Sequence, residues 1–276
     1  AFAEATSLKY IVISLLVSTG IFVLVLAWII TTRLVAPLRQ LTLWSGQVAD
    51  GDLSFLEIAA PANEIGQLIK SFRKTVMSLQ QAAEENKRYD WLQTGQLELD
   101  DQLRGDQSLS ELAKRIINYV AAYLEAQVGA LYIYDKDILR LQAGYACTSG
   151  EGLAEQFASG QGIVGQAAVE NKPIFLTELP DNYIQVRSAL GKSRPNHITV
   201  FPFAYNDNVK AVLELGTFVA LTELHVSFLE NVGEKLAIAI NGAQARCQLQ
   251  EALAMYFKEV ASAKASFLFT SATRTQ

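Results

Sequence analysis

The feature that most constrains this chain is an apolar run near its start. Residues 10–32 lie between Lys9 and Arg33 and contain no charged side chain. At about 1.5 Å of rise per helical residue, such a stretch matches the roughly 30 Å hydrocarbon core of a bilayer. The run is too long for a signal peptide, and no clear small-residue cleavage site follows it. We therefore predict a transmembrane helix over residues 10–32.

The flanking charges predict the orientation of this helix. Arg33 and Arg39 follow the run, whereas Glu4 and Lys9 precede it. Because basic residues favour the cytoplasmic side of a membrane, we expect everything from Arg33 onward to be cytoplasmic. Residues 1–9 are then the end of an extracytoplasmic segment. Since the chain does not begin with methionine, we expect it to be a piece of a longer protein.

Pro37 interrupts the helical pattern soon after the apolar run. Proline lacks the amide donor, and its ring clashes with the preceding helical turn. Apolar residues nevertheless resume, stop at an Asp-Gly turn, and restart with alternating spacings of four and three. Two short seams joined by a connector cannot be buried in a monomer, so the pattern predicts a parallel dimer that forms a four-helix bundle. The seam residues are Leu34, Leu38, Leu41 and Val48, with Trp44 beside them, and then Ile65, Ile69, Phe72, Val76, Leu79 and Ala83.

Residues 33–86 resemble a HAMP domain, the signal-converting module found just inside the membrane in bacterial receptors. The resemblance rests on Pro37 and the leucines after it, on GDLS at 51–54, and on NEIGQL at 63–68. Family members more often carry aspartate at the position of Asn63. The alternative that the heptads leave open is an ordinary coiled coil after a membrane anchor.

The HAMP resemblance implies a signal-relay role for Pro37, Glu64 and Gly66. Pro37 would decouple the membrane helix from the first cytoplasmic helix, so that a displacement becomes a change in bundle packing. Such a bundle switches when two packings differ by only a few kcal/mol, because a small input then shifts their populations.

The charged segment that follows predicts a helical, coiled-coil linker over residues 87–107. A second apolar seam runs along it, offset by one residue from the first, and such an offset strains a supercoil locally. Its members are Tyr89, Leu92, Gln96, Leu99 and Leu103. The stretch 90–107 resembles the linker that joins HAMP and GAF domains in one group of bacterial sensor histidine kinases.

From Ser108 the pattern changes to helix, hairpin, short helix, hairpin and helix. This order predicts an antiparallel sheet flanked by helices, an α+β fold. The hairpins are expected at 128–147 and 197–218, and a loop rich in turn formers is expected from Glu178 to Asn196. The helix that closes the domain continues through residues 246–276 as a C-terminal helix and tail.

Residues 108–245 resemble a GAF domain. The matching stretches are GQGIVGQA at 160–167, NKPIF at 171–175 and VKAVLELGTF at 209–218. GAF domains bind small ligands between the sheet and a covering loop, or act as dimer spacers without a ligand, and the resemblance leaves both open.

If a ligand binds, the loop from Glu178 to Asn196 is the expected lid. Tyr183, Arg187 and His197 are then the candidate ligand-binding residues. A purely structural loop is the alternative, and the chemical identity of any ligand stays open. We assign no cofactor.

Other chemistry finds little support in the sequence. Cys147 and Cys247 are far apart and lack metal-ligand spacing, which favours free thiols and no metal site. His225 begins a helix, but the acidic, arginine and proline residues that follow a phosphoaccepting histidine are missing after it. The net charge of −5 gives no basic character for nucleic acid. We therefore expect no catalytic residue and no nucleic-acid partner.

The combined resemblances imply the input half of a bacterial membrane sensor histidine kinase. We expect a homodimer in the bacterial inner (cytoplasmic) membrane that relays a stimulus to a kinase output domain and its response regulator. The 276 residues contain neither a phosphoacceptor box nor an ATP-binding domain, so we expect no catalytic domain in this chain. The alternatives are a non-enzymatic membrane scaffold, a chemoreceptor-type signalling protein, and a cyclic-dinucleotide enzyme whose output domain is missing.

Overall fold

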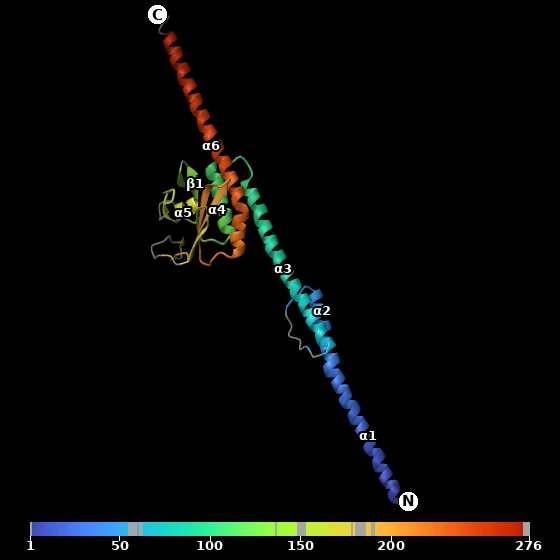
Figure 1. The fold of residues 1–276 in the computed structure, drawn as a ribbon. Coiled ribbons are helices and arrows are strands. Elements are labelled where there is room, and N and C mark those ends of the chain that lie inside the picture. The colour runs from blue at the N-terminus through green and yellow to red at the C-terminus, as the bar shows by residue number, and fades with distance from the viewer. Residues whose placement is uncertain are drawn as a thin grey trace. The chain divides into compact units, whose positions relative to one another are not determined.

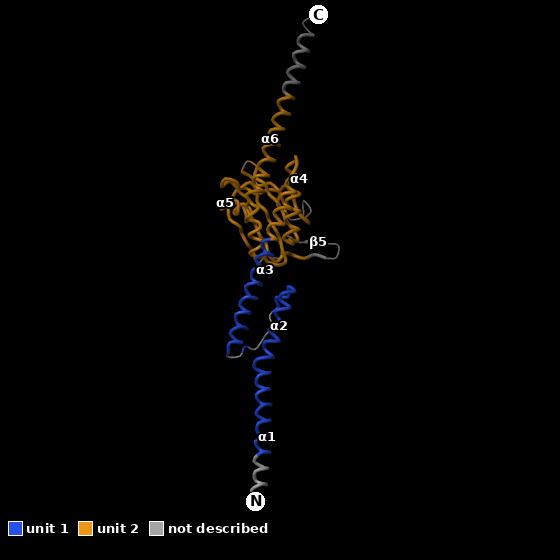
Figure 2. The backbone as a smooth tube through the Cα atoms, turned by 90° about the vertical axis from the view of Figure 1, so that its right-hand side faces the viewer, with its two compact units in different colours: residues 1–89 blue, residues 90–276 orange. Residues whose placement is uncertain are grey.

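The computed structural model divides the chain into two compact units, residues 1–89 and residues 90–276 (Figure 2). The described residues are 2–54, 60, 63–135, 137–147, 153–177, 179, 186–188 and 191–272, and the described side chains lie within residues 12–258.

The first unit begins with an apolar helix. Helix α1 (Phe2–Ile30) passes into a π-helical turn, η1 (Thr31–Val35), and then into helix α2 (Ala36–Ala49). The described aliphatic side chains of α1 are exposed on every side of it. A helix that is apolar all round is either buried in a protein core or spans a membrane. Within the described residues, the stretch Val12–Ala49 alone is long and apolar enough to cross a bilayer.

Helices α2 and α3 (Glu64–Leu103) pack side by side in this unit (Figure 1). Phe72 meets Trp44, and Gln80 further along α3 binds Leu53 beyond the end of α2, so the two helices run parallel. Trp44, Ile69 and Val76 form their buried core, and Leu41, Val48, Ile65 and Phe72 pack against it. These are the residues that the heptad spacing predicted, except that Trp44 is the centre of the seam rather than its neighbour.

Helix α3 continues without interruption from the first unit into the second. The division between the units falls between Tyr89 and Asp90, in the middle of its 40 residues. The chain after Asp90 packs with the second unit, so the segment predicted as a linker is largely an element of that unit.

The second unit contains a six-stranded antiparallel sheet. Its strands lie in the order β3-β2-β1-β8-β7-β4, and a separate two-stranded sheet pairs β5 with β6. The strands are β1 (Val128–Asp135), β2 (Ile138–Tyr145), β3 (Gln156–Ala158), β4 (Ile174–Leu176), β5 (Val186–Ser188), β6 (Gly191–Ser193), β7 (His197–Tyr205) and β8 (Asn208–Thr217).

Helices cover both faces of this sheet (Figure 1). Helix α4 (Leu109–Tyr123) and helix α6 (Glu223–Ala272) pack on one face, together with the C-terminal part of α3. Helix α5 (Gly162–Glu170) packs on the other face. Alternation along β1 supplies both cores, since Leu131 and Ile133 join the first and Ala130 and Tyr132 join the second.

The predicted α+β fold, with an antiparallel sheet between helices, is confirmed. Both predicted hairpins are present as β1–β2 and β7–β8. The segment 178–196 differs from the prediction, because its described part contains the short hairpin β5–β6 rather than loop alone.

Candidate functional site

Pro37 lies in the first turn of α2, immediately after η1. In an uninterrupted α-helix its ring would collide with the carbonyl of Arg33, four residues earlier. The π turn has a different geometry, since the N–H of Ala36 donates to the carbonyl of Thr31, five residues back. The predicted interruption at Pro37 is therefore a local change of helix type, and the chain stays helical through it.

The connector between α2 and α3 is fixed to both helices. The Trp44 Nε1–H donates to the carbonyl of Ser54 at 3.3 Å, and the Gln80 amide donates to the carbonyl of Leu53. The Ser54 N–H in turn donates to the Asp52 carboxylate at 2.9 Å. The GDLS segment is thus bound to the helix core at the end of α2.

Asn63 caps the N-terminus of α3. Its Oδ1 accepts a hydrogen bond from the Gly66 N–H at 3.1 Å, the geometry of a helix N-cap. Glu64 follows in the first turn, where a carboxylate interacts favourably with the helix dipole. Of the three predicted signal-relay residues, Pro37 therefore begins α2, while Glu64 and Gly66 begin α3.

Several seam leucines of the first unit are exposed in the single chain. Leu38 and Leu79 retain 40% and 47% of their accessible surface, although Trp44 and Ile69 are completely buried. One packed pair of helices therefore covers only part of the predicted seam.

The second seam packs differently from the prediction. Leu99 is completely buried in the core of the second unit, and Leu92 and Leu103 pack against that core, while Tyr89 is exposed. Leu99 is therefore covered by helices of its own unit and is not free to face a partner helix. Spacing alone could not distinguish these two partners, because both are apolar helix faces.

An aromatic cluster attaches α3 to α4 and α6. The Trp91 ring stacks on Tyr123 with centroids 4.6 Å apart and meets Phe228 edge-on at 5.7 Å. The Tyr123 hydroxyl donates to the carbonyl of Trp91 at 2.5 Å, and the Tyr119 hydroxyl donates to the carbonyl of Gly95 at 2.9 Å. Sequence analysis did not single out these aromatic residues, because no spacing rule links α3 to a helix that follows a turn.

Burial and the nearby Glu98 carboxylate raise the pKa of both tyrosines. Tyr119 and Tyr123 therefore stay protonated at physiological pH and keep their hydrogen-bond donors.

His225 also belongs to this cluster. Its ring lies 5.4 Å from that of Trp91, and its side chain is half-buried. Burial lowers the pKa of His225. A neutral imidazole against an indole is a packing role, and it differs from the exposed position that a phosphate acceptor requires.

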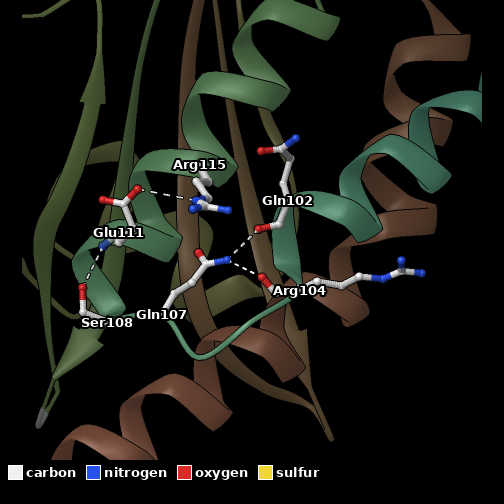
Figure 3. A network of polar contacts seen from close by, with 6 residues as sticks. All are labelled: Gln102, Arg104, Gln107, Ser108, Glu111 and Arg115. Carbon is white, nitrogen blue, oxygen red and sulfur yellow. Dashed lines mark hydrogen bonds and ion pairs between the residues drawn. The ribbon is translucent and has the colours of Figure 1, made fainter.

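The turn from α3 to α4 is held by side-chain caps (Figure 3). The Gln107 amide donates to the carbonyls of Gln102 and Arg104, at 3.3 Å and 2.5 Å, and so satisfies the C-terminal end of α3. Ser108 accepts from the Glu111 N–H at 3.2 Å and caps the N-terminus of α4. Gly105 has φ of +103°, a conformation that favours glycine, and lets the chain reverse between the two helices.

Of the three candidate ligand-binding residues, the structure describes the side chain of His197 alone. Tyr183 lies outside the described residues, and only the backbone of Arg187 is described, in β5. His197 begins β7, where Ile198 and Val200 face α5. Alternation along the strand therefore puts His197 on the opposite face.

A hollow of about 340 Å³ lies beside His197. Its described lining consists of Thr177, Leu179, Arg194, Pro195, Asn196 and His197. The Arg194 guanidinium donates to the carbonyl of Leu179 at 3.3 Å. The buried Nδ1 of His197 has no hydrogen-bond partner among the described residues. The lid predicted for a ligand remains a prediction, because most of it lies outside the described residues.

The two cysteines are free thiols. Cys147 is partly buried and Cys247 is exposed. Among the described residues, no group of three His, Cys, Asp or Glu side chains is arranged to hold a metal ion.

The architecture is that of a modular protein of the sensing and signal-transduction class. The family model of the HAMP domain matches residues 29–81, and a family model described as GAF domain matches residues 106–241. The chain therefore contains an N-terminal apolar helix, a HAMP domain, a helical region and a GAF domain. No curated protein sequence matches the chain.

Solved structures of GAF domains are similar to the second unit. The GAF domain of an Acinetobacter phosphoenolpyruvate-protein phosphotransferase is 19% identical, with TM-score 0.46, and the match covers 59% of this chain and 98% of that one. The corresponding domain from Coxiella burnetii is 20% identical, with TM-score 0.46, over 58% and 96% of the two chains. The free methionine-R-sulfoxide reductase of Neisseria meningitidis is 13% identical, with TM-score 0.44, over 58% and 91%.

Proposed function

We propose that this chain is the input half of a bacterial membrane sensor histidine kinase. The apolar helix α1 spans the inner membrane, the HAMP domain converts its displacement into a change of helix packing, and α3 carries that change to the GAF domain. The observation that carries this proposal is the continuity of α3, which contributes Ile69 to the HAMP core and Leu99 to the GAF core.

A parallel homodimer is part of the proposal. The seam residues Leu34, Leu38 and Leu79 are exposed, whereas Trp44, Ile69 and Val76 of the same helix pair are buried. A second copy packed in parallel would remove these leucines from water, at roughly 25 cal/mol for each Å² of apolar surface buried. The four helices would then form the bundle expected for a HAMP dimer.

The output partner is proposed to be a kinase domain that acts on a response regulator. Helix α6 leaves the GAF core and continues to Ala272, and its described side chains beyond Arg246 are exposed. A helix that emerges from a regulatory domain can pass a displacement to a domain attached after it.

The test joins the chain after Gln276 to the dimerisation and catalytic core of a histidine kinase. The fusion is reconstituted in nanodiscs, and phosphate uptake from labelled ATP is measured. We expect Pro37→Ala to change the rate of uptake several-fold, because it permits an uninterrupted α-helix between α1 and α2.

Gly46→Ala is the matched control, since Gly46 lies in α2 with open space where a Cβ would be added. It is expected to leave the rate unchanged. Equal rates for the wild type and Pro37→Ala would contradict the relay, and label on the unfused chain would contradict the assignment of the chain as an input half.

A further inference from the structure

Gly95 lies where α3 approaches α4 most closely. A Cβ added to Gly95 would lie 2.5 Å from Cε1, 2.6 Å from Cζ and 2.7 Å from the hydroxyl oxygen of Tyr123. Real Cβ atoms do not approach other heavy atoms so closely, so a side chain here would displace the Tyr123 ring, which is held by its stack on Trp91 and by the hydrogen bond of its hydroxyl. The ring of Tyr123 thus occupies a notch in the surface of α3.

The tyrosine hydroxyls fix the position of α3 along its axis. Tyr119 and Tyr123 are one turn apart on α4, and the carbonyls of Gly95 and Trp91 that accept from them are one turn apart on α3. Tyr119 also donates to the Glu98 carboxylate at 3.2 Å. Backbone carbonyls recur at every turn of α3, so a helix shifted by one turn, about 5.4 Å, would offer the two hydroxyls equivalent acceptors. The hydrogen bonds by themselves would therefore permit α3 to slip by a turn.

The residues that flank the notch prevent such a slip. Four residues before Gly95 is Trp91, and four residues after it is Leu99, both with large side chains. Moving α3 by one turn in either direction would bring one of them under the Tyr123 ring, where there is no room even for a Cβ. The docked helix therefore has a single register.

Helix α6 lies against the same docked segment. The Lys235 ammonium meets the Asp100 carboxylate at 2.9 Å, and Phe228 packs against Trp91. Along α3 the two contact residues come in the order Trp91, Asp100, and their partners on α6 come in the order Phe228, Lys235. These two helices therefore run parallel where they touch. The contacts that hold α3 in register are thus shared with the helix that leaves the domain.

We propose that Gly95 is a register notch that makes the docking of α3 on the GAF domain all-or-none. A force along α3 cannot slide the helix gradually. It must instead detach residues 91–103 from α4 and α6 as one unit. This inference deepens the proposed relay and rests on it for its role in signalling, but the docking itself is testable without any kinase.

The test is hydrogen–deuterium exchange on the full chain in nanodiscs, with Gly95→Ala compared with the wild type. Alanine in a helix normally stabilises it relative to glycine. At Gly95 we expect the opposite, an increase of about tenfold or more in exchange of the amides in residues 92–103. The strands β1 and β8 should keep their protection.

Two controls make the outcome specific. Gly46→Ala makes the same substitution in an open helical position and should not speed exchange anywhere. The double variant Tyr119→Phe with Tyr123→Phe keeps both rings but removes both hydroxyls, and should loosen residues 92–103 as well.

Two results would overturn the proposal. In the first, Gly95→Ala leaves residues 92–103 as protected as they are in Gly46→Ala, so that no notch exists. In the second, β1 and β8 lose protection together with residues 92–103, so that α3 is an inseparable part of the core. Neither result depends on the kinase fusion, whose failure would instead contradict the proposed function.

Discussion

The Tyr123 side chain meets Trp91 twice, through its ring and through its hydroxyl. The two rings stack with centroids 4.6 Å apart, and the hydroxyl donates to the backbone carbonyl of the same tryptophan. One residue of α4 therefore fixes both the side chain and the backbone of α3 at the point where that helix enters the GAF unit.

Truncation of Trp91 should strongly weaken the docking of α3 on the GAF unit. Trp91→Ala removes the contacts with Tyr123, Phe228 and His225, and we expect a loss of about 3 kcal/mol in the free energy that holds residues 92–103 against α4 and α6. Hydrogen exchange of the amides in residues 92–103 measures this loss, and the strands β1 and β8 should keep their protection. Tyr89→Ala is the control on the same helix, since Tyr89 is 66% exposed, and it should change the free energy by less than about 0.5 kcal/mol.

Trp44 should have the corresponding role in the HAMP unit. It is completely buried, packs edge-on against Phe72 at 5.0 Å and binds the connector through Ser54. Trp44→Ala should cost about 3–5 kcal/mol there. Hydrogen exchange should show faster exchange in α2 and at the start of α3, with the GAF sheet unchanged, whereas Leu43→Ala, at a 65% exposed position, should have little effect. Equal effects of the two substitutions would contradict the assigned core.

The N-cap of α3 can be tested by a pair of substitutions at one position. Asn63→Ala removes the acceptor for the Gly66 N–H and should destabilise the HAMP unit by about 1 kcal/mol. Asn63→Asp keeps an acceptor and adds a negative charge at the helix N-terminus, so it should be neutral or stabilising. In thermal unfolding, the midpoint temperature of Asn63→Ala should be below that of the wild type. The midpoint temperature of Asn63→Asp should equal or exceed that of the wild type. A more stable alanine variant would exclude the cap.

His225 predicts a dependence of stability on pH. Burial lowers its pKa in the folded chain below the ordinary value of 6.5, so the unfolded chain binds the proton more readily. The contribution is therefore fully present above pH 6.5 and is lost as the pH falls through that value. The denaturation midpoint of the wild type should fall between pH 7.5 and pH 5 by more than that of His225→Gln, which cannot titrate there. Parallel curves would show that His225 titrates normally.

The two thiols should differ in reactivity. Burial raises the pKa of the Cys147 thiol, whereas Cys247 is exposed on α6. Since the thiolate is the nucleophile, a maleimide should modify Cys247 about tenfold faster or more at neutral pH. Mass spectrometry of timed reactions identifies the modified cysteine. The Cys247→Ser variant should retain only the slow reaction, and a fast reaction in that variant would contradict the burial of Cys147.

Local patterns were sufficient to predict most of the fold. The two hairpins were predictable because their strands are apolar and their turns at Asp137 and at Asn206–Asp207 use residues that tolerate positive φ. The HAMP helices were predictable because their seam repeats at heptad spacing. Both signals depend on residues close together in the sequence, and the folded structure keeps the turns and the seam that they predict.

The partner of the second seam could not be predicted from its spacing. Leu99 sits at a heptad position, and only the three-dimensional packing shows that α4 and α6 cover it. Gly105 shortly after the seam is an ordinary helix stop signal, but a stop signal does not indicate that α4 folds back against α3. The face on which His197 lies was also not evident from its sequence position, because strand alternation turns it away from the α5 face.

The π turn at Thr31–Val35 also sets the rotational phase between α1 and α2. One extra residue in a helical turn rotates everything after it by about 100°. An uninterrupted α-helix would therefore place a different stripe of α1 in line with the side of α2 that holds Trp44 against Phe72. Any change that converted the π turn into an α turn would rotate one end of the rod against the other, so the junction is a defined rotational offset within one continuous helix.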